Sequence, residues 1–227
     1  MHARAFPVSN MTGRSTVRSH GAALGVRCHS GWAAFVVLAG SFNEPKILER
    51  GRMALCDAEI EGSKQPFHTA EGLPFPSAAG FIESCSASTA RLAELAIEGL
   101  VARHGRIVGC CVLAASARPL PGLAGLLASH SLIHAAEGEF YREAISAAVN
   151  RIRIPIQRVR ERDLETAADT LLAPSQRRKA LLEGFGRQVG PPWTQDEKRS
   201  ALAAWIALAP PRTGVRPARG ARTLEGP

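Results

Sequence analysis

The stretch GVRCHSGWAAFVVLAG, residues Gly25–Gly40, contains two apolar runs separated by a short turn at His29–Gly31. A short strand and a second run rich in valine and aromatic residues, joined by a tight turn with glycine, are typical of an antiparallel β-hairpin. The turn residues SFNEP follow, and KILERGRMALCD, residues 46–57, alternates loosely between apolar and polar positions. The chain is therefore predicted to begin its folded part with three antiparallel strands.

Two more strands are predicted further along the chain, each flanked by helical patterns. RIVGCCVLAA, residues 106–115, is an apolar run of the buried-strand type, and IPIQRVRE, residues 154–161, alternates. Residues 62–80, rich in proline and glycine, are predicted to form a long loop. Helices are predicted over residues 86–105, 129–144, 162–173, 175–186 and 194–209, the last with Thr194 as N-cap and Glu197 at the capping-box position. The order β-β-β-α-β-α-β-α predicts an α/β fold, a five-stranded mixed sheet with right-handed crossovers and helices on its faces.

The charge of the chain lies mainly at its ends. Of the formal charge of +8, residues 1–20 contribute three arginines without an acid, and residues 211–227 contribute four arginines against one acid. The body, residues 21–210, is thus close to neutral and is predicted to be one domain. The two ends are predicted to be a disordered basic leader and a disordered basic tail. Nucleic acid is a candidate partner, but the body does not have the charge of a basic nucleic-acid module.

The cysteines and the hydropathy bear on the compartment. The five cysteines form no C-x-x-C pair and their number is odd, which favours reduced, buried thiols in a cytoplasmic protein. No apolar run approaches the length that spans a bilayer, so no membrane partner is expected. The sequence does not predict an oligomeric state.

The second half of the chain resembles a known superfamily. SHSLIHAAEGEFYREAISAAVNRIRIPIQRV, residues 129–159, resembles a helix with a central glycine that precedes a strand in Holliday-junction resolvases and related (RuvC-like) proteins. QDEKRSALAAWIALA, residues 195–209, resembles their closing helix, and GVRCHSGWAAFVVL takes the place of their first two strands. The resemblance covers most of residues 21–210. It implies a ribonuclease H-like fold and divalent-metal-dependent nuclease or phosphohydrolase activity.

The resemblance also implies where metal ions would bind. These enzymes hold two Mg²⁺ ions with carboxylates from separate elements, the first of them on the opening strand. At that place the chain has Arg27, with Cys28 and His29 beside it, and no acid. Asp196 and Glu197 keep the acidic feature of the closing helix. The acidic site is therefore degenerate, and a catalytically silent binding or assembly module of the same fold is the alternative to an enzyme.

The helix over residues 129–144 carries a second candidate site. Its period puts Ile133, Ala136, Phe140, Ala144 and Ala148 on the buried stripe and His130, His134, Glu137 and Tyr141 on a flanking stripe. Glu139 and Glu143 are expected to point to solvent. H-x-x-x-H-x-x-E places two imidazoles and a carboxylate where one divalent ion such as Mn²⁺ or Zn²⁺ can bind. The alternative is a boundary stripe in which His134 bonds Glu137 and Tyr141 reaches solvent with its hydroxyl.

The predicted topology brings these candidates together at one edge. Loops after strands and helix N-termini gather at the carboxyl ends of the strands in α/β folds. His29 follows the first strand, and His68 in the long loop is placed to cover the edge. The sequence thus predicts metal ligands His130, His134, Glu137, Asp196 and Glu197. It predicts catalytic roles for His29, His68, Glu137 and Asp196, the two histidines acting as general acid or base. The candidate cofactor is a divalent metal: Mg²⁺, Mn²⁺ or Zn²⁺.

Overall fold

The computed structural model describes residues 21–115, 119–172 and 174–209. Five strands form one mixed sheet in the order β3-β2-β1-β4-β5. β1 pairs antiparallel with β2, β2 pairs antiparallel with β3, and β4 and β5 run parallel to β1. The strands are β1 Ala22–His29, β2 Trp32–Ser41, β3 Glu44–Ala54, β4 Ile107–Ala114 and β5 Ile156–Arg160. The predicted mixed sheet, three antiparallel strands followed by crossovers, is confirmed. The predicted leader and tail lie outside the described residues.

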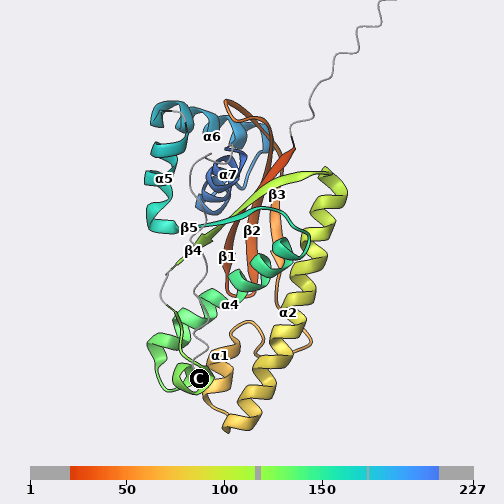
Figure 1. Ribbon diagram of the computed structural model, residues 1–227, viewed down its shortest axis with the longest axis vertical. Coiled ribbons are helices and arrows are strands. Elements are labelled where there is room, and N and C mark those ends of the chain that lie inside the picture. Colours follow the sequence, from red (N-terminus) through yellow and green to blue (C-terminus); the bar gives the residue numbers. More distant parts are fainter. Residues whose placement is uncertain (1–20, 116–118, 173, 210–227) are drawn as a thin grey trace, which may run out of the picture.

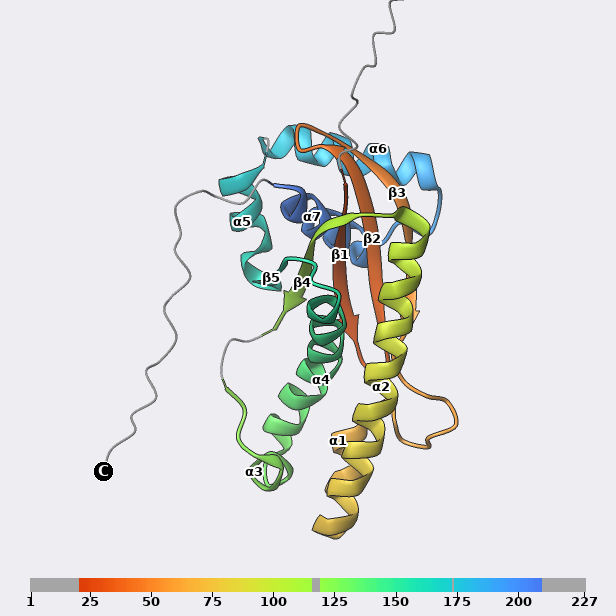
Figure 2. The same ribbon diagram turned by 45° about the vertical axis from the view of Figure 1, so that its right-hand side comes forward.

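Helices cover both faces of the sheet (Figures 1 and 2). The helices are α1 Pro66–Glu71, α2 Phe75–His104, α3 Leu123–Leu127, α4 His130–Arg151, α5 Leu164–Leu171, α6 Ser175–Val189 and α7 Gln195–Leu208, with a short 3-10 turn η1 Glu161–Asp163. Successive residues of β1 point to opposite faces. Leu24 and Val26 pack in the core with α2 and α4, whereas Ala23 packs with α5 and α7. The body is thus a three-layer arrangement.

Helix α7 lies unusually close to the central strand. A Cβ atom at Gly25 would lie 1.9 Å from the carbonyl oxygen of Ser200, so only glycine allows this approach. Gly109 of β4 has the same role against the carbonyl of Ala207, with 2.7 Å. These two glycines fix α7 across β1 and β4, and thereby set the position of the residues at its N-terminus.

The prediction of a loop over residues 62–80 is wrong. This segment contains α1 and the first turn of α2, a helix of 30 residues. The prolines misled the prediction because Pro66 and Pro76 occupy the first turns of these helices, where a missing N–H costs nothing. The N-terminal halves of α2 and α4 extend beyond the sheet, and α1 and α3 pack against them (Figures 1 and 2). This helical extension has a small core of its own, built around Phe67, Leu126 and Ile133.

All five cysteines lie within the described ranges and are free thiols. Four are buried, and Cys56 is half-buried. Burial raises the pKa of Cys28 and of Cys111 to about 12. No helix in the described part of the chain has the length and apolar character to cross a membrane.

Candidate functional site

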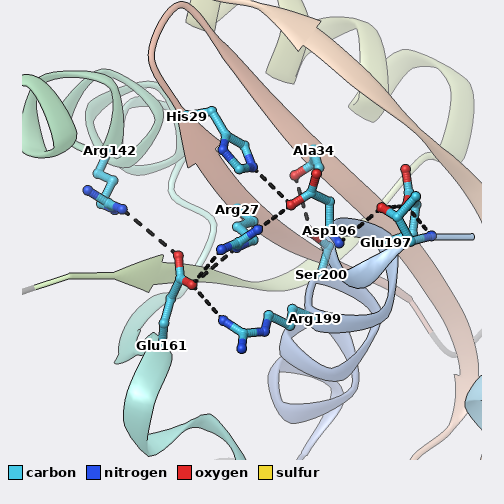
Figure 3. Close-up of polar contacts among 10 residues, drawn as sticks. Arg27, His29, Ala34, Arg142, Glu161, Asp196, Glu197, Arg199 and Ser200 are labelled. Carbon is cyan, nitrogen blue, oxygen red and sulfur yellow. Dashed lines mark hydrogen bonds and ion pairs between the residues drawn. The ribbon is translucent and has the colours of Figure 1, made fainter.

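Six polar side chains meet at the carboxyl ends of β1, β4 and β5, and we call Arg27, His29, Arg142, Glu161, Asp196 and Arg199 the edge cluster (Figure 3). The Arg27 guanidinium lies between two carboxylates. It donates to Glu161 Oε2 from Nε at 3.1 Å and from Nη2 at 2.9 Å, and it donates to Asp196 Oδ1 from Nη1. About a fifth of each of these three side chains is exposed, with 21% for Arg27. A cation of the protein therefore occupies the space between the two acids.

The remaining members complete a nearly closed network. His29 Nε2 lies 3.0 Å from Asp196 Oδ1, and Arg199 Nη1 donates to Glu161 Oε2 at 2.8 Å. Arg142, buried on α4, has Nη2 at 4.0 Å from Glu161 Oε1 and donates from Nε to the carbonyl of Leu113 at 2.8 Å. The imidazole of His29 is also held by its stacking on the ring of Trp32, with 4.3 Å between centroids.

The pKa shifts follow from this pairing. Burial alone would raise the pKa of both carboxyl groups, but the Arg27 hydrogen bonds and the neighbouring positive charges outweigh it, so the pKa of Asp196 and that of Glu161 are lowered. Burial likewise opposes the charge on Arg27, and its two carboxylate partners raise its pKa in spite of it. Both acids and Arg27 are thus ionised at neutral pH.

The start of α7 positions Asp196. Thr194 is the N-cap, and its side chain accepts a hydrogen bond from the backbone N–H of Asp196. Glu197 closes the predicted capping box, because its Oε2 accepts the Thr194 backbone N–H at 2.7 Å. The predicted capping box is confirmed. It also moves Glu197 away from the role of metal ligand, since its carboxylate is buried and engaged by the helix cap.

Three members of the edge cluster are missing from the sequence prediction. Glu161 directly follows β5, so the rule that selected His29 after β1 also applied to it. Because IPIQRVRE alternates between apolar and polar residues, Glu161 was predicted to be the last residue of the strand. Arg142 and Arg199 lie on helices, and no local sequence pattern distinguishes them from the arginines that are exposed on helix surfaces.

The structure brings His29 and Asp196 together but does not bring His130 and His134 to them. These two histidines lie on the helical extension with His68 of α1, and we call the three the histidine cluster. One nitrogen from each ring lies within 4.8 Å of the others. His130 and His134 were predicted to lie at the sheet edge because the sequence does not show that the N-terminal half of α4 extends beyond the sheet. Along α4, Arg142 at the edge is eight residues from His134, about 12 Å away at 1.5 Å per residue.

Glu137 and Tyr141 are core residues, which corrects the prediction of a flanking stripe. Glu137 is 4% exposed, and its Oε1 accepts the backbone N–H groups of Phe67 at 2.8 Å and of His68 at 3.1 Å. Tyr141 is fully buried and donates its hydroxyl to the carbonyl of Ser63 at 2.8 Å. The segment predicted as a loop covers Glu137 and Tyr141, whereas His130 and His134 of the same stripe are exposed. Burial raises the pKa of Glu137, although its hydrogen bonds oppose the rise.

The residues at the edge do not fit a pair of Mg²⁺ ions. Mg²⁺ prefers oxygen ligands in a near-octahedral arrangement and needs carboxylates with free lone pairs. Here the guanidinium of Arg27 bonds both acids, and Arg199 bonds one of them again. The described residues at this edge therefore form a closed salt-bridge network in place of a site for two metal ions.

No protein-family model matches the chain, and no curated protein matches it. Among solved structures, the chain is similar to RuvC of T. thermophilus in complex with a Holliday junction substrate, with a TM-score of 0.49 and 10% identity. It is also similar to a second Thermus thermophilus RuvC structure, with a TM-score of 0.47 and 10% identity. Each alignment covers 82% of this chain and 92% of the other. At this level of similarity, the roles of individual residues depend on the geometry of this chain alone.

Proposed function

We propose that this chain is a ribonuclease H-like domain that acts by binding, and that its sheet edge does not cleave phosphodiester bonds. The observation that supports the proposal is the position of Arg27, hydrogen-bonded to both Asp196 and Glu161. Two-metal hydrolysis requires carboxylates that are free to hold the ions. In this chain the opening strand supplies a fixed positive charge where that chemistry needs a negative one.

The electrostatic cost of a metal ion at this place is large. Two unit charges about 4 Å apart interact by about 4 kcal/mol at an effective dielectric constant of about 20, so a divalent ion would be repelled by Arg27 by about 8 kcal/mol. By the same arithmetic the two acids attract the ion by about 16 kcal/mol, so Arg27 cancels about half of their attraction. Of the metals that the sequence suggests, Mg²⁺ and Mn²⁺ are therefore disfavoured at the edge, and Zn²⁺ remains for a site rich in imidazole.

A nuclease assay tests the proposal. The full chain is incubated with a four-way DNA junction, duplex DNA and single-stranded DNA, each with Mg²⁺ and with Mn²⁺. We expect no cleavage above that of the Asp196→Asn variant, which keeps the shape of the side chain and removes its charge. Cleavage by the wild type that Asp196→Asn abolishes would show that the edge is catalytic, and the proposal would be wrong.

Nucleic acid is the partner to test first, because most of the net charge lies in the two basic ends. The edge cluster itself offers little surplus charge, since three arginines face two carboxylates that they already neutralise. Binding through the ends is expected to be electrostatic, independent of sequence and steeply weakened by salt. Binding that persists at high salt would instead point to a specific surface on the folded body.

A further inference from the structure

The histidine cluster lies on the helical extension, apart from the edge cluster. His130 and His134 are one turn apart on α4, and His68 comes from α1, which packs against that turn. The ring centroids of His68 and His134 are 4.7 Å apart, and those of His130 and His134 are 4.6 Å apart. We propose that His68, His130 and His134 bind one Zn²⁺ ion, with Glu137 positioning His68 from behind. This inference does not depend on the proposed function.

The spacing of the nitrogen atoms suits a tetrahedral ion. The Nε2 atoms of His130 and His134 face each other at 3.1 Å. Zn–N bonds of about 2.0–2.1 Å in tetrahedral geometry place two ligand nitrogens about 3.3–3.4 Å apart. Residues at i and i+4 share one face of a helix, so a small rotation of either ring is enough to reach that spacing. One nitrogen of His68 lies within 4.8 Å of one nitrogen of each of the other two rings.

A carboxylate fixes the orientation of His68. Glu137 Oε1 lies 3.1 Å from Nδ1 of His68, so Nδ1–H donates to it and Nε2 is left as the metal-binding atom. The same oxygen accepts two backbone N–H groups of α1, which anchors the histidine's helix to α4. A second carboxylate oxygen, Oε2 of Glu71, lies 3.8 Å from Nδ1 of His130. Imidazoles backed by carboxylates are typical of protein zinc sites.

The burial of Glu137 supports a cation nearby. Its Oε2 atom is buried and has no hydrogen-bond partner among the described residues. A buried carboxylate is costly unless positive charge compensates it. A Zn²⁺ ion on His68 makes the Nδ1–H a stronger donor and brings two positive charges within reach of this acid. Without the ion, His130 and His134 are joined by one hydrogen bond between neutral imidazoles, which is weaker than a bond to a charged group.

The cluster opens to solvent on its other side. The side chain of His130 is 65% exposed, and His134 is also exposed. Three protein ligands leave one tetrahedral position, which water occupies in sites of this type. The proposed site therefore has the ligand set of an open zinc centre, whereas a closed structural site has four protein ligands.

Calorimetric titration of the full chain tests the site. The protein is first treated with a chelator and then titrated with Zn²⁺ alone. We expect one ion per chain and a rise in melting temperature on loading. His134→Ala and His68→Ala are each expected to abolish this binding, while Glu137→Gln weakens it by about 10–100-fold because the carboxylate that orients His68 is lost. His104→Gln is the matched control, a histidine outside both clusters that bonds Glu49.

Cobalt gives a readout of the ligands themselves. Co²⁺ bound by three imidazoles and a water shows the intense visible absorption of four-coordinate cobalt, and His134→Ala should remove it. Melting of the metal-free variants shows whether each is folded, so a lost site is not confused with a lost fold. Three results would overturn the proposal: no Zn²⁺ binding by the wild type, binding that survives His68→Ala, or binding abolished by Asp196→Asn.

Discussion

Replacing Arg27 with alanine is the most informative perturbation of the edge cluster. The guanidinium makes three hydrogen bonds to two carboxylates, and a hydrogen bond to a charged group contributes about 1.5–3 kcal/mol when buried. About a fifth of each partner is exposed, which reduces these values. Arg199 still forms an ion pair with Glu161 after the substitution. We expect the free energy of unfolding at neutral pH to fall by about 2–3 kcal/mol.

The cost of Arg27→Ala should depend on pH in a definite direction. The folded-state pKa values of Asp196 and Glu161 lie below their ordinary values of 3.8 and 4.5. A lowered carboxyl pKa stabilises the fold above the unfolded-state pKa, and this contribution is lost as the pH falls through the folded-state pKa. The difference between wild type and variant should therefore be full above about pH 5 and should shrink below about pH 4.

Urea denaturation over a series of pH values measures both effects. Arg91→Ala is the matched control, because the Arg91 side chain is 61% exposed and its nitrogen is 3.8 Å from Asp57, so its loss should cost less than about 1 kcal/mol. The same titration with Mg²⁺ should stabilise Arg27→Ala and leave the wild type unchanged, because the variant lacks the guanidinium that bonds both acids in the wild type. The reasoning is refuted if Arg27→Ala costs no more than the control, or if its cost is the same at about pH 3 as at neutral pH.

Four further changes test the packing, the cap and the charged ends. Gly25→Ala should cost about 3 kcal/mol in urea denaturation, because the added carbon meets the Ser200 carbonyl; a neutral result would contradict the close approach of α7. Tyr141→Phe should cost about 1–2 kcal/mol, since two backbone carbonyls lose their donor, and unchanged stability would mean that water replaces the hydroxyl. Thr194→Ala should lower stability by about 1 kcal/mol through the lost N-cap, as measured by thermal melting, and no loss would argue against the capping box. Changing the four arginines of residues 211–227 to glutamine should reduce the salt dependence of DNA binding by about 0.9 per lost phosphate contact, and an unchanged slope would exclude the tail.

The sequence determined the elements whose signal is local. The apolar runs and the turn at His29–Gly31 were enough for β1 and β2, because a hairpin requires only alternation and a tight turn. The capping box at Thr194 was also predictable from the sequence, since its two partners are three residues apart. Chain order then gave the mixed sheet, because short connections and right-handed crossovers leave few arrangements. The loop predicted over residues 62–80 is wrong because it was based on a local signal, the number of prolines. The helices in this segment are stabilised by packing against α4, which the local sequence does not show.

The grouping of the polar side chains was decided by tertiary structure alone. Arg27 and Asp196 are 169 positions apart, and only the close packing of α7 on Gly25 makes them partners. His68 joins His134 because α1 docks on α4 through a buried carboxylate, which no spacing in the sequence encodes. Side-chain periodicity assigns a residue to a face of its own helix. Periodicity does not show how far a helix extends past the sheet. In this chain the projecting half of α4 separates the histidine cluster from the edge cluster.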